Sequence, residues 1–370
     1  MARTIVGVND AKAVKKWAGL LAYDTSHKSY FNQRFMARGA EAEVPIQILT
    51  DLESDAGEQI SYDLLAELKM APVEGEDILE GKEEGQKFYT DQIYIDQARC
   101  GVNTGGRMTR KRTLHDLREK AKRQQSSWWA RLMDELLFVY LSGQRGINAN
   151  FLLPAGYTGR ANNALVTPDA NHTLYGGDAT AFNNLDANDK FDLRLIDRAK
   201  TKADSQGGGA TDIPVLQPCK IDGEETFVCV MHTFQEDDLR SNTQTGQWMD
   251  IQKAAAGAEG RKNPLFKGSL GMYRGVILHS HRNVIRSNTA GAGNVESARA
   301  LFMGSQAAVV AFGSPGTNLR FDWHEETRDN GDKVVISTSS IFGVKKVTFT
   351  TGAGAQDFGV FSLDTAAASR

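Results

Sequence analysis

The chain has 370 residues, of which 41% are hydrophobic and 24% are charged, and its formal net charge is −3. This balance excludes wholesale disorder, and it argues against a dedicated nucleic-acid binder, which would carry a large basic excess. No apolar run approaches the roughly 20 residues that span a bilayer, and the N-terminus lacks the apolar core of a secretory signal.

The first 58 residues contain one predicted helix and an aromatic segment. Apolar residues at helical spacing predict a short amphipathic helix over 11–23, with Val14, Trp17, Leu20 and Leu21 on one face. Phe31, Phe35 and Met36 follow in a stretch without a clear helix or strand pattern. Because these side chains would be unfavourable on a free surface, we expect the stretch to pack as an extended arm, in its own fold or against a neighbouring chain.

The clearest strand pattern runs over 59–70, where Ile60, Tyr62 and Leu64 begin a strict alternation of apolar and polar residues. A second strand is predicted over 88–102. The connector carries three glycines and many acidic residues, so the economical interpretation is one long hairpin with a charged, mobile tip. Its charged residues are Glu74, Glu76, Asp77, Glu80, Lys82, Glu83, Glu84 and Lys87. Since an isolated hairpin is marginal in water, we expect this one to lie on a partner surface.

The longest predicted element is a helix over 113–143, in which apolar residues recur at steps of three, four and seven. Thr113 with Asp116 predicts its N-terminal cap, and Gly143 predicts its end. At a rise of roughly 1.5 Å per residue the helix would be about 45 Å long, more than a compact domain needs. Its first half is charged and the part over 128–141 is apolar nearly all round, so we expect the first to cover other elements or chains and the second to be buried.

The segment 101–113 joins the hairpin to this helix and is basic. Its glycines are not a phosphate-binding loop, because the Gly-Lys-Ser/Thr sequence is missing. A basic loop at the entry of a helix is the better interpretation, and it could neutralise acidic groups such as the hairpin tip of a neighbouring subunit. The basic residues are Arg107, Arg110, Lys111 and Arg112.

The rest of the chain predicts an α+β fold with short elements. A surface excursion is expected over 144–187, followed by an amphipathic helix over 189–204. Two strands, 215–221 and 225–232, flank the turn Asp222-Gly223, a favoured hairpin signal. The remaining predictions are a helix over 234–256, a strand over 275–281, an apolar helix or buried strand over 297–312, and strands over 319–325, 333–340 and 345–351 with a hairpin turn at Asn330-Gly331.

Few residues point to chemistry. His279 and His281 alternate on one predicted strand and, with a carboxylate near His324, define the alternative function, a metal-dependent hydrolase. Cys219 and Cys229 lie on adjacent predicted strands, where a buried pair of thiols is favoured over a redox centre. Three widely spaced cysteines predict no disulfide framework and fit synthesis in a reducing cytoplasm. Hydrolase and dinucleotide motifs are missing, so we expect no enzyme and no cofactor.

The order of these segments resembles the major capsid proteins of tailed bacteriophages with the Hong Kong 97 fold. An arm, a long acidic hairpin, a very long helix and an α+β region follow one another as in that fold. More closely, the sequence is similar to the major capsid family named for phage N-four. The matching segments are 60–102, 227–239, Trp248, 263–278 and 298–313.

The resemblance implies an N-terminal arm (1–58), an extended hairpin called the E-loop (59–102), a peripheral domain (103–214) with the spine helix 113–143, an axial domain (215–315), and a return to the peripheral domain with a C-terminal tail (316–370). It implies a structural subunit of hexamers and pentamers in an icosahedral head around double-stranded DNA. The implied partners are other copies of the chain, a separate scaffolding protein and a portal at one vertex, with a cement or decoration protein as a further candidate. Assembly would take place in the host bacterial cytoplasm.

The resemblance also implies specific contacts. The acidic hairpin tip would lie over a neighbour's peripheral domain, with Arg107, Arg110, Lys111 and Arg112 as its charge partners. Some relatives link a hairpin lysine covalently to an asparagine of another subunit. Nothing in the sequence identifies a partner for Lys82 or Lys87, so we expect no such link.

Overall fold

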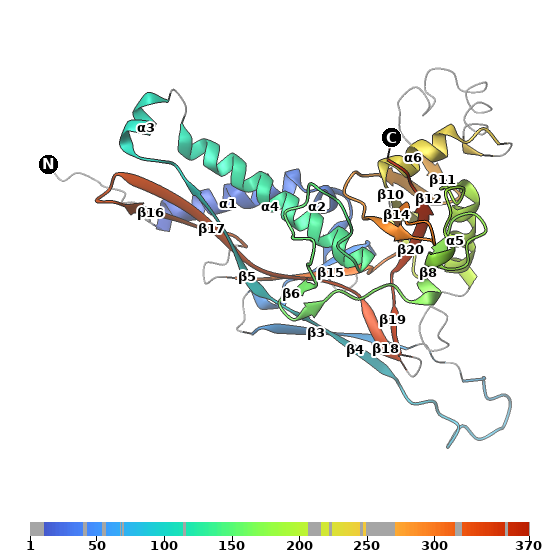
Figure 1. Cartoon of the computed structure of the whole chain (residues 1–370). Helices are drawn as coiled ribbons and strands as arrows, with labels where there is room; N and C mark the ends of the chain where they lie inside the picture. Colours follow the sequence, from blue (N-terminus) through green and yellow to red (C-terminus); the bar gives the residue numbers. More distant parts are fainter. Residues whose placement is uncertain are drawn as a thin grey trace.

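The structure is a computed structural model that describes residues 11–39, 43–53, 57–66, 68, 70–113, 116–205, 216–221, 224–244, 247–248, 271–314, 320–351 and 354–369. Two mixed sheets lie side by side, with the longest helix over one of them and a thin hairpin that projects away from the body (Figure 1).

The N-terminal segment folds as two helices, α1 (Ala11–Lys28) and α2 (Tyr30–Arg34). The predicted helix over 11–23 is therefore confirmed and continues to Lys28, while the side chains of Val14 and Trp17 lie outside the described residues. α1 packs along the longest helix, where Lys122 forms an ion pair of 3.0 Å with Asp24. The stretch expected to be extended is therefore helical over α2, where the hydroxyl of Ser29 caps the helix.

The hairpin is shorter than its sequence pattern predicts. β3 (Gln59–Leu65) pairs with β4 (Phe88–Tyr94), and the chain leaves the strand conformation after Leu65. The predicted strand over 59–70 is therefore wrong beyond residue 65. Its later apolar side chains have no surface of this chain to pack on, since Leu68 is 67% exposed.

The second predicted strand, 88–102, is two strands that are separated at Ile95. β4 belongs to the hairpin, whereas β5 (Asp96–Asn103) pairs antiparallel with β17 (Lys333–Lys346) of the main sheet. The change of partner at one residue connects the hairpin directly to the body of the molecule.

The long helix α4 (Leu117–Ser142) begins four residues later than predicted. The carboxylate of Asp116 accepts the N–H groups of Arg118 and Glu119, so Asp116 is the N-cap, whereas Thr113 has an extended backbone and ends the short helix α3 (Arg107–Arg112). The predicted end is confirmed, because Gly143 has a φ of 69° and closes α4. The second half of α4 is buried almost all round, as predicted.

The first sheet has six strands in the order β1-β2-β15-β17-β16, with β5 also paired to β17. The strands not yet defined are β1 (Met36–Arg38), β2 (Ile46–Leu49), β15 (Ala308–Gly313) and β16 (Asp322–Arg328). α4 lies on this sheet, where the indole N–H of Trp129 donates to Thr338 Oγ1 at 2.9 Å and Gln125 donates to the carbonyl of Ile336 at 3.0 Å.

The second sheet has eight strands in the order β11-β12-β10-β14-β20-β8, with β13 on β14 and β9 on β10. Helix α5 (Leu193–Ser205) covers one face and shares a core with Phe227, Phe302 and Phe361. The strands are β8 (Thr173–Tyr175), β9 (Cys219–Ile221), β10 (Glu224–Met231), β11 (Met272–Tyr273), β12 (Val276–Ser280), β13 (Arg286–Ala290), β14 (Val295–Met303) and β20 (Val360–Ala366).

The short elements complete the fold and correct several predictions. Four short elements lie in the excursion 144–187 in addition to β8: β6 (Gly159–Arg160), β7 (Asn163–Ala164), η2 (Ala170–His172) and η3 (Phe182–Asn184). The short elements elsewhere are η1 (Asp51–Glu53), α6 (Thr233–Ser241), β18 (Thr348–Thr351) and β19 (Gly354–Asp357). The apolar segment 297–312 is two buried strands, β14 and β15, which lie in different sheets. The helix predicted over 234–256 ends at Ser241, and residues 249–256 and the turn Asp222-Gly223 lie outside the described residues. At the predicted turn 330–331, Asn330 and Gly331 both have positive φ.

The two sheets do not follow the sequence boundaries at 215 and 315. β8 and β20, from outside these limits, lie in the second sheet, and β15, from inside them, lies in the first. The two layers are joined by Arg299, which forms a bidentate ion pair with Asp364 and donates to the carbonyl of Ser142 at the end of α4.

Gly143→Ala is expected to lower the free energy of unfolding by about 2 kcal/mol or more, because an alanine Cβ in the left-handed region is strained. The added Cβ would also lie 2.2 Å from the carbonyl oxygen of Val166. Urea unfolding of the isolated subunit measures the change. Gly156→Ala is the control, since no atom lies within 4 Å of its added Cβ. Equal stability of the two variants would contradict the assigned role of Gly143.

Candidate intersubunit surfaces

The root of the hairpin is held by side chains from the β6–β7 turn. The amide of Asn163 bonds both backbone groups of Tyr94, accepting its N–H at 3.0 Å and donating to its carbonyl at 2.7 Å. Arg160 donates to the carbonyl of Asp96 at 2.5 Å, and its guanidinium lies over the ring of Phe342. These contacts fix the direction in which β4 leaves the body, just before the chain changes partner at Ile95.

The stem of the hairpin is attached to the first sheet at a second place. Asp91 on β4 accepts a hydrogen bond from the hydroxyl of Tyr62 at 2.5 Å and forms an ion pair with Lys345 of β17. Below it, Ile60 and Ile93 pack in a small separate core with the aromatic residues of the β18–β19 hairpin. The stem is therefore anchored in two ways, by the apolar contacts of Ile60 and Ile93 and by the ion pair of Asp91 with Lys345.

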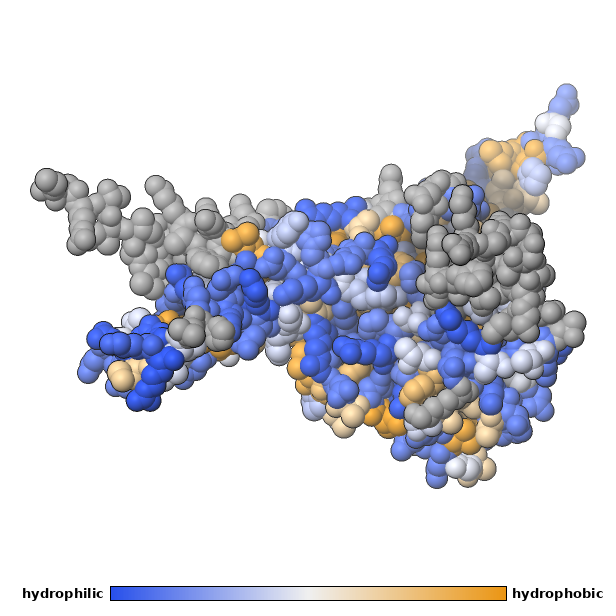
Figure 2. All heavy atoms as spheres, turned by 90° about the horizontal axis from the view of Figure 1, so that it is seen from above, coloured by the Kyte–Doolittle hydropathy of each residue, from blue (hydrophilic) through white to orange (hydrophobic). Residues whose placement is uncertain are grey.

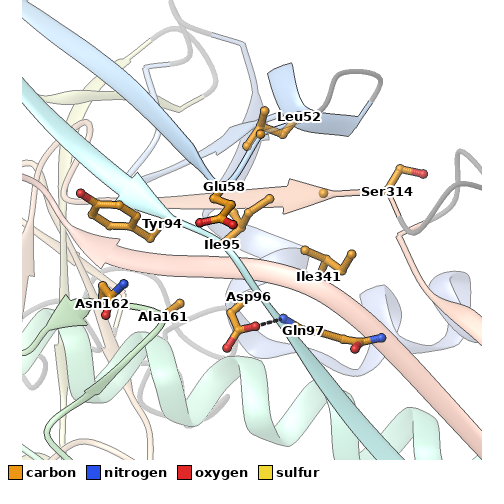
Figure 3. Close-up of a pocket in the computed structure, with 12 residues that line it drawn as sticks. Leu52, Glu58, Tyr94, Ile95, Asp96, Gln97, Ala161, Asn162, Ser314 and Ile341 are labelled. Carbon is orange, nitrogen blue, oxygen red and sulfur yellow. Dashed lines mark hydrogen bonds between the residues drawn. The ribbon is translucent and has the colours of Figure 1, made fainter.

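A crevice of about 640 Å³ opens beside this root (Figure 3). Glu58 and Asp96 supply its carboxylates, while Tyr94, Ile95 and Ile341 supply apolar surface. Its lining contains no histidine or cysteine. The crevice therefore combines two carboxylates with apolar side chains at the place where the hairpin leaves the body.

The extension between the strands, described at residues 66, 68 and 70–87, projects from the molecule (Figure 1). Ile78 is 70% exposed and Leu79 is 50% exposed, so two large apolar side chains stand on the projecting tip. Of the charged residues predicted for the tip, Glu84 is half-buried and accepts the N–H of Met70, and the others are exposed. Lys82 lies 3.5 Å from Asp77 within the tip itself.

The predicted basic partners lie at the opposite end of the same subunit, on α3 (Figure 1). The N–H of Arg107 donates to the carboxylate of Asp332, and Arg110 donates to the carbonyl of Asp332, so α3 rests on the β16–β17 turn. Lys111 and Arg112 are exposed. In Figure 2, the end of the molecule where α3 and this turn lie is strongly hydrophilic. The structure therefore separates the hairpin tip and α3 within one chain.

The aromatic residues of the arm pack within their own chain. Phe31 packs on Phe138 of α4, Phe35 packs on Phe31 and is also buried, and Met36 is half-buried against the same core. Asp134 of α4 holds this segment, because its carboxylate accepts the Ser29 hydroxyl and the N–H groups of Tyr30 and Phe31. Burial raises the pKa of Asp134 to about 6. Of the two alternatives, packing in the same fold is the one observed.

His279 and His281 lie among aromatic rings. The ring of His281 stacks on Phe138 with centroids 5.0 Å apart and lies 4.5 Å from that of Tyr30. Burial, aided by Arg282 and Arg34, lowers the pKa of His281 to about 4, so the imidazole is neutral. No cluster of three or more potential metal ligands occurs among the described residues. His324 is on β16 of the other sheet, where the neighbouring Glu325 accepts hydrogen bonds from Arg118 and Trp323.

The cysteines are free thiols in this structure. Cys219 and Cys229 are buried, and burial raises the pKa of each thiol to about 12. A thiol with this pKa is protonated and unreactive at neutral pH. The interpretation as buried thiols fits this geometry.

Sequence reasoning missed the residues that hold the hairpin root. Asn163 and Arg160 fall in a segment that was interpreted as a surface excursion. One signal was present in the sequence, the asparagine at 162. Asparagine tolerates the positive φ that Ala161 and Asn162 adopt in this two-residue hairpin turn. The long-range partner Tyr94 carries no local signal.

A family model described as a phage capsid protein matches residues 5–369. The chain belongs to the phage capsid protein family. It is 26% identical over 368 residues to the major capsid protein of Pseudomonas phage KPP25, with 90% of each chain covered. The resemblance derived from the segment order is thereby confirmed.

Solved capsid structures show the same fold. The capsid of Ralstonia phage GP4 matches with a TM-score of 0.82 and 47% identity over 100% of this chain and 99% of that chain. The capsid asymmetric unit of cyanophage Pam1 matches with a TM-score of 0.72 and 21% identity over 93% and 94% of the two chains. The predicted α+β fold of Hong Kong 97 type is confirmed.

These matches decide between the two predicted functions. The chain is a structural capsid protein and hence a component of a phage virion, and the metal-dependent hydrolase finds no support in the family or in the surroundings of His279 and His281. Among the described residues, no helix is both long and apolar enough to cross a membrane.

His281→Asn is expected to flatten the loss of stability in acid. The folded-state pKa of His281 is about 4 against an ordinary 6.5, so the unfolded chain binds the proton first and stability falls as the pH drops from about 6.5 to 4. Asparagine does not titrate, and it can still accept the N–H of Asn283 as the imidazole does. Unfolding temperatures at a series of pH values between 7 and 4 measure the slope.

Wild-type protein in the same buffers is the reference, and His232, whose pKa is also lowered to about 4 mainly by burial, titrates equally in both proteins. Identical slopes for the two proteins would show that His281 is not held neutral. A chelator should leave both unfolding temperatures unchanged.

Proposed function

We propose that copies of this chain form the hexamers and pentamers of an icosahedral phage head that encloses double-stranded DNA. The observation that carries this proposal is the extension 66–87, which presents Ile78 and Leu79 to solvent at the end of a rigidly anchored stem. An isolated subunit gains nothing from exposing these side chains, whereas a neighbouring subunit can cover them. Similarity to the capsids of GP4 and Pam1 supports the same conclusion.

The acidic tip is assigned to contact the basic helix α3 of a neighbouring subunit. Within one chain the two lie at opposite ends (Figure 1), which suits a head-to-tail contact that repeats around a ring. The acidic residues are Glu74, Glu76, Asp77, Glu80, Glu83 and Glu84, and the basic ones are Arg107, Arg110, Lys111 and Arg112. Lys82 and Lys87 are placed at the same interface.

The apolar residues of the tip supply the larger energy. Covering Ile78 or Leu79 fully would stabilise the contact by about 1.5–3 kcal/mol each, whereas an exposed ion pair contributes roughly 0.2–1 kcal/mol. The charges therefore select the partner surface and the position of the tip on it, and the apolar side chains stabilise the contact once it has formed. Repetition of a modest contact in every ring makes the shell stable.

The domain assignment follows the sheets. The hairpin over 59–102 acts as the E-loop, and α4 with the first sheet forms the peripheral domain. The axial domain is placed on the second sheet, so it takes β8 and β20 in addition to most of 215–315. The arm, 1–58, belongs to the peripheral domain through Phe31, Phe35 and Met36.

Other components of the head are proposed from the family. A separate scaffolding protein guides assembly in the host bacterial cytoplasm, a portal occupies one vertex, and a cement or decoration protein can bind outside. The net charge of −3 fits a shell lining that contacts DNA weakly and without sequence specificity, because many phosphate contacts per subunit would oppose DNA release. Negative-stain microscopy of the chain co-expressed with its scaffolding protein tests the proposal, and a persistent monomer would refute it.

Deletion of residues 73–87 is expected to abolish shell assembly and leave a folded subunit, because the extension makes no core contact in its own chain. Negative-stain microscopy counts shells, and far-ultraviolet circular dichroism monitors folding. The length-preserving variant Ile78→Ser/Leu79→Ser should show most of the same defect. Normal shells from the deleted chain would remove the hairpin from its assigned role.

Charge reversal on either side should slow assembly, and combining the two should restore it in part. The tip variant is Glu76→Lys/Glu80→Lys, and the helix variant is Lys111→Glu/Arg112→Glu; light scattering follows the rate. Arg194→Glu, an exposed change on α5, is the control and should assemble normally. If the combined variant assembles no faster than either alone, the tip and α3 are not partners.

A further inference from the structure

A buried lysine and a buried aspartate face each other where two strands end. Lys346 is the last residue of β17 and Asp357 is the last residue of β19. The Lys346 Nζ atom lies 2.7 Å from Asp357 Oδ1, and each side chain is only 2% exposed. The fold therefore encloses an amine nitrogen and a carboxyl group in direct contact.

As a plain ion pair, this site is poorly satisfied. Among the described residues, neither Lys346 Nζ nor Asp357 Oδ2 has a hydrogen bond of acceptable geometry. Buried polar groups in folded proteins are almost always hydrogen-bonded, and a buried ion pair offsets its desolvation only when its other hydrogen bonds are also made. The Lys346 nitrogen touches the carboxyl group without a hydrogen bond of good geometry, and Asp357 Oδ2 is left unsatisfied, so the pair calls for another explanation.

We propose that Lys346 and Asp357 condense to form an intramolecular isopeptide bond between Lys346 Nζ and Asp357 Cγ. The pair contains every atom that the reaction needs. A proton passes from the ammonium to the carboxylate within the pair, which leaves a neutral amine and a carboxylic acid. The amine nitrogen then attacks Cγ, the bond from Cγ to one oxygen breaks, and that oxygen leaves as water with one hydrogen from the acid and one from the amine.

The surroundings favour the two neutral reactants. Burial lowers the pKa of the Lys346 ammonium and raises the pKa of the Asp357 carboxyl, so both shifts move the pair toward amine and acid. A neutral amine is the nucleophilic form of lysine. The backbone is also fixed at this point, because the N–H of Asp357 donates to the carboxylate of Asp169 at 3.0 Å. Asp169 is held in turn by the ring of His172.

Two other charged pairs near this site lack the same conditions. Lys345 pairs with Asp91, but this pair is more exposed, and Asp91 also accepts the hydroxyl of Tyr62. Arg299 and Asp364 are buried, but a guanidinium stays protonated in proteins and is not a nucleophile. Lys346 and Asp357 alone among these pairs combine burial, contact and an amine.

The bond would close a ring over 346–357 that contains the β18–β19 hairpin. Phe349 of β18 and the neighbouring Phe358 pack against Ile60 and Ile93 of the E-loop stem. The ring would therefore fix the platform under the hairpin root covalently, within one subunit. It differs from a link between subunits, since the denatured chain would still migrate as a monomer.

Intact-mass spectrometry of the full chain, unfolded in acid after purification, tests the proposal. The wild-type chain is expected to be lighter than its sequence by one water molecule. Lys346→Arg, which keeps the charge but cannot form the amide, should have its full sequence mass. Asp357→Asn should form the same amide with loss of ammonia instead of water. Wild-type protein at full sequence mass would overturn the proposal.

Peptide mapping locates the bond and separates it from dehydration elsewhere, such as succinimide formation at the Asp222-Gly223 sequence. Trypsin should fail to cut after Lys346, and chymotrypsin, which cuts after Phe349, should release fragments that stay joined through Lys346 and Asp357. Hydroxylamine should leave them joined. The matched control Lys345→Gln removes the adjacent lysine and should retain the loss of water. If the lost water maps to another residue, or if Lys346→Arg shows the same loss, the bond does not form.

Discussion

The burial of α4 is the constraint on which the rest of the molecule depends. The half of the helix that ends at Gly143 is enclosed by the first sheet, by α1 and α2, and by strands of the second sheet. A helix that is apolar all round is stable only inside such a shell. Two of its polar attachments, that of Trp129 to the first sheet and that of Ser142 to Arg299 of the second, set the position of one sheet relative to the other.

The other half of α4 has a different task. It carries charge and is exposed on much of its surface, and its cap at Asp116 lies four residues beyond the end of the basic helix α3. One continuous helix thus connects the buried centre of the subunit to the hydrophilic end at which α3 lies (Figure 2). The contact proposed for α3 would thus lie near the exposed end of a helix whose other end is held in the core.

The sequence predicted what depends on local pattern and missed what depends on distant partners. The period of α4, its end at Gly143 and the turn at Asn330-Gly331 follow from neighbouring residues, so they could be predicted. The end of β3 at Leu65 could not, because the alternation continues beyond it and only the lack of a surface stops the strand. The division of 88–102 at Ile95 depends on contacts with Asn163 and with β17. Both partners are distant in the sequence, so no local signal marks the division. The order of segments, by contrast, identified the family.

The hairpin combines a fixed root with an unpaired tip, and assembly needs both. Were the root free to swing, each subunit contact would have to overcome the conformational entropy of the whole extension, about 1–2 kcal/mol for every backbone residue that becomes ordered. The bonds of Asn163 and Arg160 to residues 94–96 meet that cost once, during folding of the subunit. Only the few residues of the tip then become ordered on contact. The free energy gained by burying Ile78 and Leu79 can therefore exceed the entropy that is lost. If the tip were packed against its own subunit, Ile78 and Leu79 would already be buried, and contact with a neighbour would gain no further free energy from them.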